Sequence, residues 1–281
     1  MWKRREVEDR RRCCWAVRSL LWIICLTQTA CLPTSRDPVG GGSLTVAAAS
    51  DLSDVLSEAR NRFERQTASK VILSFGSTGL LAKQIEQGAP FDVFLAAAAS
   101  FVDNLNRQGL VVEGSVQTFA RGRLVIWRSD QARVGVERIL DLENPAVQRV
   151  ALANPEHAPY GKAGRQALEN SGLWSRIQHK IVFGENVRQA LQFAETGNAD
   201  AALVALALTR RAGGRFVLVP EELHEPIVQT LCILRRTSNA VLARSFVQFL
   251  TTSDGRELLS QYGFFPLSGK DSQSRPSSSS Q

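Results

Sequence analysis

The strongest constraint on the fold is an alternation of short apolar runs with segments of helical spacing. Ser43–Ala49, Val71–Phe75 and Val93–Ala96 have the length and composition of buried strands. Between the first two runs, apolar residues recur on one face of a helix over residues 51–66, at Leu52, Val55, Leu56, Ala59 and Phe63. This order predicts an α/β fold with mostly parallel sheets, right-handed crossovers and flanking helices.

The same alternation continues to the end of the apolar sequence. Further strands are predicted at Leu124–Trp127, Val150–Ala153, Ile181–Phe183 and Ala201–Leu206. Helices are predicted over 80–87, 101–108, 161–171, 186–196, 239–250 and 253–262. Sheets of this kind bind ligands at the carboxyl ends of their strands, so the strand-to-helix turns are where a site is expected.

The charge of the chain is unevenly distributed. The net charge is +7, and residues 1–18 alone contribute +4 from seven basic and three acidic side chains. The remaining +3 forms no basic stripe, so we expect no nucleic-acid partner. After residue 35 no apolar run reaches 18 residues, so no membrane-spanning helix is expected there.

The N-terminus resembles an export signal. A basic segment is followed by the apolar run 20–26 and by small residues around Ala30, which predicts a signal over residues 1–35. Cys31 makes lipidation after cleavage an alternative that would tether the exported protein to the membrane. Residues 36–43 are predicted to be a linker, and 269–281 a disordered Ser-rich tail.

The cysteines provide no disulfide framework for the body. Four of the five precede residue 32, and only Cys232 remains, within an apolar strand-like run. We interpret it as a buried apolar residue. No cluster of cysteines and histidines suggests a zinc or iron site.

Four strand-to-helix turns carry small or hydroxyl residues. Their segments are Ala47–Leu52 with Ser50, Ser74–Leu80 with Ser77 and Thr78, Asn154–Gly161 with Tyr160, and Gly184–Ala190 with Val187. Hydroxyls and free N–H groups at helix openings are neutral donors that suit an anion. Individually these signals are weak, because Ser50 or Asp51 alone would be read as a helix cap.

Two other residues invite different interpretations. His157 with Ser50 or Ser77 would suit a hydrolase, although no Gly-x-Ser-x-Gly motif accompanies it. Arg188 could clamp an anion, but an arginine at this place on a helix is more often solvated or paired.

Taken together, these segments resemble the periplasmic molybdate-binding proteins of ABC importers. The similarity runs from about Leu44 to Leu267. It rests on Ala47–Ser50, Ser74–Gly79, Gln84–Pro90, Asp92–Phe94, Asn154–Gly161, Glu185–Arg188 and Tyr262–Phe264. Two departures are the alanine run Leu95–Ala99 after Asp92–Phe94, and Thr78 where serine is commoner.

The resemblance implies a two-lobe periplasmic binding protein fold of type II, with the ligand in the interlobe cleft. Lobe 1 is then expected to contain 44–119 and 228–268, and lobe 2 120–227, with crossovers near Phe119 and Pro226.

The resemblance also implies the ligand contacts. Molybdate or tungstate is expected to bind through Ser50, Thr78, Tyr160 and the backbone N–H of Val187, with Ser77 as a further contact. Tyr160, together with Ala205, matches the subtype that takes its tyrosine from the third turn. No cofactor and no catalytic residue is expected.

The implied role is non-enzymatic delivery of the ion, outside the cytoplasmic membrane, to an ABC import permease by a monomer. Three alternatives remain at this point: a binding protein for another oxyanion such as sulfate, a Ser/His hydrolase, and a regulatory sensor domain. The last would normally lack an export signal and carry a DNA-binding motif.

Overall fold

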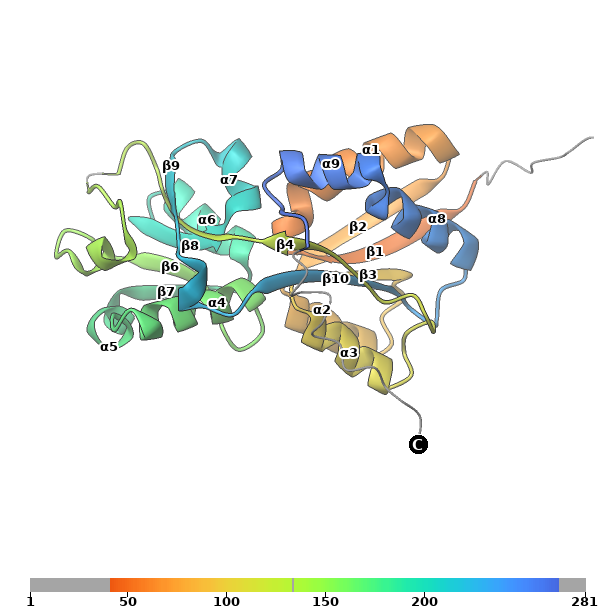
Figure 1. Cartoon of the computed structure of the whole chain (residues 1–281), viewed down its shortest axis with the longest axis horizontal. Coiled ribbons are helices and arrows are strands. Elements are labelled where there is room, and N and C mark those ends of the chain that lie inside the picture. The colour runs from red at the N-terminus through yellow and green to blue at the C-terminus, as the bar shows by residue number, and fades with distance from the viewer. Residues whose placement is uncertain (1–40, 133, 268–281) are drawn as a thin grey trace, which may run out of the picture. The chain divides into compact units, whose positions relative to one another are not determined.

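Two five-stranded sheets organise residues 41–132 and 134–267, the part of the chain that the computed structural model describes (Figure 1). The first sheet has the order β2-β1-β3-β10-β4, with β1 Ser43–Ala49, β2 Lys70–Gly76, β3 Val93–Ala96, β4 Gln117–Gly122 and β10 Ile227–Ile233. The second has the order β7-β6-β8-β5-β9, with β5 Leu124–Arg128, β6 Val150–Ala153, β7 Ile181–Gly184, β8 Ala201–Ala205 and β9 Arg215–Leu218.

Both sheets are mixed, with one strand in each running against the other four, so the prediction of mostly parallel sheets is confirmed. In the first sheet β1 pairs in parallel with β2 and β3, whereas β10 is antiparallel to β3 and β4. In the second, β6 is parallel to β7 and β8, whereas β5 is antiparallel to β8 and β9. The antiparallel pairs arise where the chain passes between the sheets. β4 continues directly into β5, and β10 returns from the second sheet to the first, so neither connection is a helical crossover within one sheet.

Helices flank each sheet and complete two α/β lobes. The first lobe carries η1 Ser50–Leu52, α1 Ser53–Thr67, α2 Thr78–Glu86, α3 Ala99–Arg107, α8 Ala240–Thr251 and α9 Ser253–Gln261. The second carries η2 Ile139–Glu143, α4 Pro159–Asn170, α5 Trp174–Ile177, η3 Gln178–Lys180, α6 Val187–Glu195, α7 Leu206–Ala212 and η4 Glu221–Leu223. Figure 1 shows α1, α8 and α9 on one side of the first sheet and α2 and α3 on the other.

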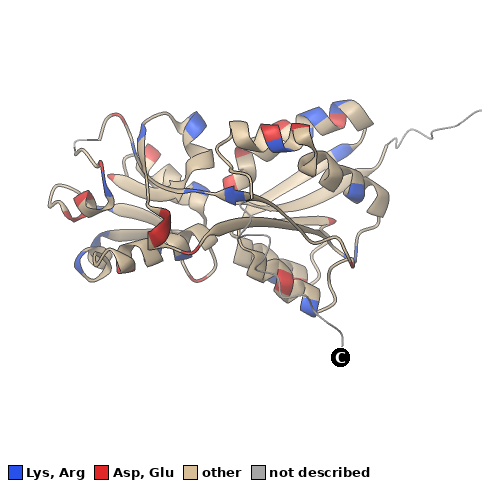
Figure 2. Ribbon diagram, viewed as in Figure 1, with Lys and Arg blue, Asp and Glu red and all other residues tan. Residues whose placement is uncertain are grey.

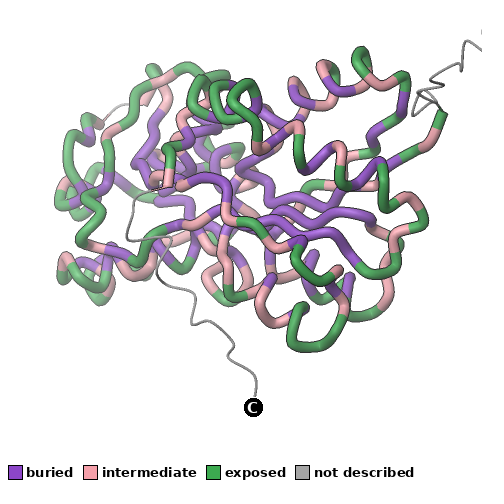
Figure 3. The backbone as a smooth tube through the Cα atoms, turned by 45° about the vertical axis from the view of Figure 1, so that its right-hand side comes forward, coloured by how far each residue is buried: buried purple, intermediate pink, exposed green. Residues whose placement is uncertain are grey.

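The central strands are buried because apolar residues cover both of their faces. In β1, Leu44, Val46, Ala47 and Ala48 have no exposed surface, as expected for a strand between two helical layers. Figure 3 shows the strands mostly in the buried colour and the outer turns of the helices exposed. Burial of this apolar surface is the main driving force for each lobe.

Two chain segments connect the sheets. Arg123 alone separates β4 from β5, and residues 219–226 separate β9 from β10. Glu221 ties the two segments together, because its carboxylate lies 3.1 Å from Arg123 Nε and 3.6 Å from Arg121 Nη2. Because β4 ends at Gly122, the first connection between the sheets lies just after Phe119, where the crossover was expected. The proposed lobe boundaries, 44–119 with 228–268 and 120–227, stay a prediction.

Some sequence predictions fall outside the described residues. These are the export signal over 1–35, lipidation at Cys31, the linker up to residue 40, and the tail over 269–281. Cys232 is a buried free thiol, and burial raises its pKa to about 12, which makes it unreactive. Within the described residues, no helix is long and apolar enough to cross a membrane.

Candidate functional site

One small cavity collects all four turns that the sequence singled out. Its walls are formed by Ala49–Asp51, Gly76–Thr78, Ala97, Ala158–Tyr160 and Asn186–Val187. These segments open η1 with α1, α2, α4 and α6, so two helix starts come from each lobe. The cavity leaves about 10 Å³ for the centre of a water-sized sphere, which is about the room that one water molecule needs. A cavity of this size has no room for an organic molecule.

Two hydroxyl groups of the first lobe are placed to donate into this cavity. Thr78 Oγ1 accepts a hydrogen bond from Ala97 N at 3.2 Å, so its own proton is free to be donated. Ser50 is only 5 % exposed. Neither η1 nor α1 has a side-chain capping hydrogen bond. The structure therefore disfavours the interpretation of Ser50 as a simple helix cap.

The start of α6 presents a backbone donor from the second lobe. The side chain of Asn186 caps this helix by accepting from Arg188 N and Gln189 N, both at 3.1 Å. The cap satisfies the second and third N–H groups and leaves that of Val187, the first, unused by it. Val187 is buried in the cavity wall, where its N–H is available to a ligand.

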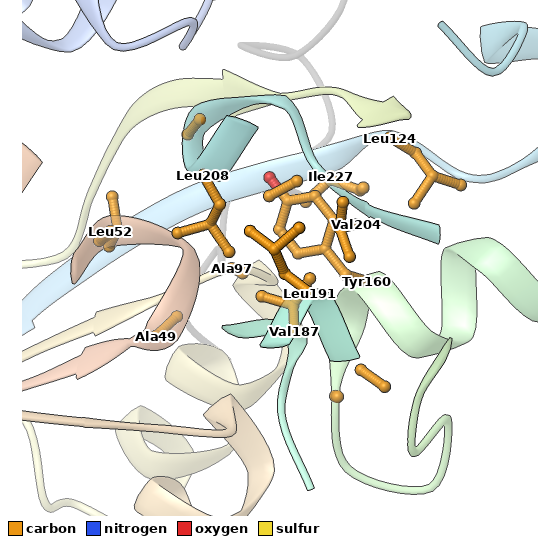
Figure 4. Packing of buried hydrophobic residues seen from close by; sticks show 14 of the residues in the cluster. Ala49, Leu52, Ala97, Leu124, Tyr160, Val187, Leu191, Val204, Leu208 and Ile227 are labelled. Atoms are coloured by element: carbon orange, nitrogen blue, oxygen red, sulfur yellow. The ribbon is translucent and has the colours of Figure 1, made fainter. Parts of the chain in front are cut away.

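Tyr160 brings a buried hydroxyl from α4 to the first lobe. Its ring lies among Val187, Leu191, Val204 and Ile227 (Figure 4). The hydroxyl makes no hydrogen bond of regular geometry within the described part of the chain, although it lies beside Asp51. Burial, and after it the charge of Asp51, raises the pKa of Tyr160 well above 10. The hydroxyl therefore stays protonated and can act as a donor.

Asp51 is the one charged side chain among the described residues that line the cavity. Its Oδ2 accepts from Gln229 Nε2 at 2.6 Å, while its Oδ1 and Gln229 Oε1 are buried and make no hydrogen bond of regular geometry with the residues that the structure describes. Burial raises the pKa of Asp51 from 3.8 to about 7, and the Gln229 hydrogen bond opposes that rise. A neutral Asp51 would be compatible with a neighbouring anion, whereas a charged one would repel it.

Gly122, at the end of β4, makes room for the Tyr160 hydroxyl. A Cβ atom at this position would collide with the Tyr160 hydroxyl oxygen and would lie 3.4 Å from Gln229 Nε2. The tyrosine thus reaches the connection between the lobes only because residue 122 has no side chain.

Ser77 lies in the cavity wall, but its hydroxyl is engaged across the lobes. Ser77 Oγ donates to the His157 carbonyl at 2.7 Å and lies 2.8 Å from His157 Nδ1. The structure therefore joins the serine and histidine of the hydrolase alternative. The geometry is not that of a nucleophile and its base, because the serine proton is given to a backbone carbonyl.

None of the described residues that line the cavity is a lysine or an arginine. Arg188 points its Nη1 to within 4.0 Å of Asp54 Oδ2 and does not line the cavity. In the view of Figure 2, basic and acidic residues are interspersed along the outer helices. Among the described residues, no group of three His, Cys, Asp or Glu side chains could hold a metal ion. The donors that converge are hydroxyl and amide groups.

Sequence reasoning missed Asp51 as a partner of Tyr160, and it missed Gln229 and Gly122 altogether. A polar residue inside the apolar run Ile227–Ile233 was the available signal for Gln229. Gly122 gave none, because its partner is 38 residues away in sequence and on the other lobe.

Comparisons with known proteins agree with this architecture. Residues 44–265 match the family model described as bacterial extracellular solute-binding protein. The chain is 35 % identical to the molybdate-binding protein ModA of Rhodobacter capsulatus, over 81 % of this chain and 90 % of that protein. It is 37 % identical to ModA of Azotobacter vinelandii, over 78 % of this chain and 88 % of that protein.

A solved structure shows the same fold. The periplasmic molybdate-binding protein of Azotobacter vinelandii superposes with a TM-score of 0.75 at 30 % identity, covering 80 % of this chain and 100 % of that one. The family binds solutes and does not catalyse reactions, which removes the hydrolase alternative. The chain belongs to the bacterial extracellular solute-binding protein family.

Proposed function

We propose that this protein binds molybdate, or the similarly sized tungstate, and delivers it to an ABC import permease outside the cytoplasmic membrane. The ion would occupy the cavity where the four turns meet. Its oxygens would accept hydrogen bonds from Ser50, Thr78 and Tyr160 and from the N–H of Val187. The names of the relatives support this ligand.

The observation that carries the proposal is the convergence of neutral donors from both lobes on one small cavity. Charge-assisted hydrogen bonds contribute roughly 1.5–3 kcal/mol each. Each helix N-terminus adds about 0.3–1 kcal/mol toward an anion when exposed. Four such donors can hold a dianion without a lysine or arginine, provided that association costs are met.

Binding from both lobes suggests how the ion controls the protein. Ser50 and Thr78 belong to the first lobe, and Tyr160 and Val187 to the second. An ion that bridges them stabilises the closed arrangement, which would present one continuous rim to a permease. Export through a signal over residues 1–35, with lipidation at Cys31 as the alternative anchor, belongs to the same proposal.

A thermal-shift and calorimetric titration of the purified protein tests the function. Molybdate and tungstate should raise the melting temperature, because a ligand of the native state stabilises it. Sulfate and phosphate should do so weakly at equal concentration, since selectivity would come from the size of the cavity. Stabilisation by sulfate without stabilisation by molybdate would contradict the ligand assignment.

A further inference from the structure

His157 joins the two lobes at the edge of the cavity through three contacts. Its carbonyl accepts from Ser77 Oγ at 2.7 Å and from Gly79 N at 2.9 Å. Its Nδ1 lies 2.8 Å from Ser77 Oγ. Because Ser77 donates its single proton to the carbonyl, Nδ1 must carry a proton and donate to Ser77. Both hydrogen-bonding roles of the serine hydroxyl are then used.

The loop that carries His157 is held rigid before it meets the first lobe. Asn154 Oδ1 accepts from Glu156 N at 3.0 Å, and Asn154 O accepts from Ala158 N at 3.0 Å. Pro155 and Pro159 further restrict the backbone. The loop can thus present the His157 carbonyl with little loss of conformational freedom.

Gly79 permits the two backbones to touch directly. A Cβ atom there would lie 2.8 Å from His157 O and 2.9 Å from His157 Cβ. Both are closer than real Cβ contacts, and neither neighbour is the flexible end of a side chain. The glycine therefore serves the interlobe contact, since its φ angle is not in the left-handed region.

We propose that His157 is a positioning residue for ion binding. It holds Ser77 and Gly79 of the first lobe by hydrogen bonds from the second lobe, an interlobe contact that we call the clasp, and so fixes Thr78, which lies between these two residues in sequence. This inference rests on the proposed oxyanion site. Thr78 is the residue between the two that His157 holds, and its hydroxyl is the donor of the second turn. Ser77 accordingly acts through His157 and does not contact the ion itself.

The test measures molybdate dissociation by stopped-flow competition and affinity by calorimetry. Each lost neutral hydrogen bond should speed dissociation roughly fivefold. His157→Phe should therefore raise the molybdate dissociation rate about fivefold, and Ser77→Ala should raise it roughly 5- to 25-fold. Association rates should change little, because the clasp forms as the lobes close. The double variant should dissociate no faster than Ser77→Ala alone, since both changes remove the same contact.

Two further variants separate a clasp from a purely structural role. Gly79→Ala should speed molybdate dissociation at least as much as Ser77→Ala, because its Cβ would lie 2.8 Å from His157 O and push the His157 carbonyl away from the first lobe. Ser115→Ala is the matched control. Ser115 is as buried as Ser77 and donates to Val112 O at 2.6 Å within the first lobe. Its loss should lower the melting temperature and leave molybdate kinetics unchanged.

The outcomes distinguish this inference from the function beneath it. A wild-type protein that binds no tetrahedral oxyanion contradicts the proposed function, and the clasp falls with it. A wild type that binds molybdate, with Ser77→Ala and His157→Phe within twofold of its dissociation rate, contradicts the clasp alone. Additive effects of these two changes would also contradict it, because Ser77 would then contact the ion independently of His157.

Discussion

Two polar clusters flank the cavity, and they differ in how completely their groups are paired. The Ser77–His157 cluster has a partner for the serine hydroxyl in both of its roles and for the histidine carbonyl. In the cluster of Asp51, Tyr160 and Gln229, Gln229 Nε2 donates to Asp51 Oδ2, while three buried atoms make no hydrogen bond of regular geometry with the described residues: Asp51 Oδ1, Tyr160 Oη and Gln229 Oε1. Paired groups stabilise a closed structure, whereas buried unpaired groups destabilise it until a ligand, water or proton satisfies them.

This difference assigns different roles to the two clusters. The first is suited to holding the lobes together, and the second to responding to what enters the cavity. The predictions below test that contrast, from the largest expected effect to the smallest.

The largest effect is expected from Asp51→Asn, measured as the pH dependence of unfolding free energy. Burial raises the pKa of Asp51 from 3.8 to about 7. A raised folded-state pKa means that its stabilising contribution is complete below pH 4 and is lost as the pH rises to 7. At about 1.4 kcal/mol per pKa unit, the loss is up to about 4 kcal/mol.

The asparagine variant should therefore match the wild type near pH 4 and become more stable than it as the pH rises. Urea denaturation at several pH values measures this difference. If the free energies of unfolding of the two proteins changed in parallel between pH 4 and 7, the pKa of Asp51 would not be raised. The contrast between the two clusters would then lose its support.

Tyr160→Phe should separate ligand affinity from stability. If the hydroxyl donates to the ion, its loss removes a bond of roughly 1.5–3 kcal/mol, which is about a 10- to 150-fold loss of affinity. The ligand-free melting temperature should change little, because the hydroxyl makes no hydrogen bond of regular geometry with the described residues. Calorimetry and a melting curve check both parts. Undiminished affinity would remove Tyr160 from the contacts.

Gly122→Ala should destabilise the connection between the lobes by about 1–3 kcal/mol through overpacking. The new methyl group would collide with the Tyr160 hydroxyl oxygen. Combining it with Tyr160→Phe should relieve part of the destabilisation, because the closest atom is then absent. Equal urea midpoints for Gly122→Ala and the wild type would show that the tyrosine can leave this position freely.

The smallest effect is expected from Arg188→Ala. Arg188 Nη1 and Asp54 Oδ2 are 4.0 Å apart, and the arginine side chain is 41 % exposed. Because solvent screens the pair, its contribution to stability should be less than about 1 kcal/mol. Molybdate affinity should change less than about fivefold. A larger loss in the calorimetric titration would make Arg188 an ion clamp and would contradict a site built from neutral donors.

The sequence predicted most helices and strands because their apolar periodicity is local. The strands Ser43–Ala49, Val93–Ala96 and Val150–Ala153 were predicted with the bounds that the structure has. β4 and β9 were missed: polar residues interrupt β4, β9 has only the three apolar residues Phe216–Leu218, and both pair with strands that are distant in sequence. The direction of β10 also follows from connectivity and not from any local pattern.

For the site, the turns were predictable and their hydrogen bonds were not. Ser50, Thr78, Tyr160 and Val187 stand at helix openings that sequence patterns mark, and the structure brings these openings to one cavity. That Ser77 pairs with His157, or that Tyr160 lies against Asp51 and Gly122, depends on contacts between lobes. Such contacts leave no periodic signal in the chain.

Anomalous diffraction at the molybdenum edge, from crystals grown with molybdate, tests the central claim most directly. The account predicts one strong peak between the turns of the two lobes, with ion oxygens within hydrogen-bonding distance of Ser50 Oγ, Thr78 Oγ1, Tyr160 Oη and Val187 N. A peak held by lysine or arginine side chains, or an interlobe cavity without a peak, would contradict it.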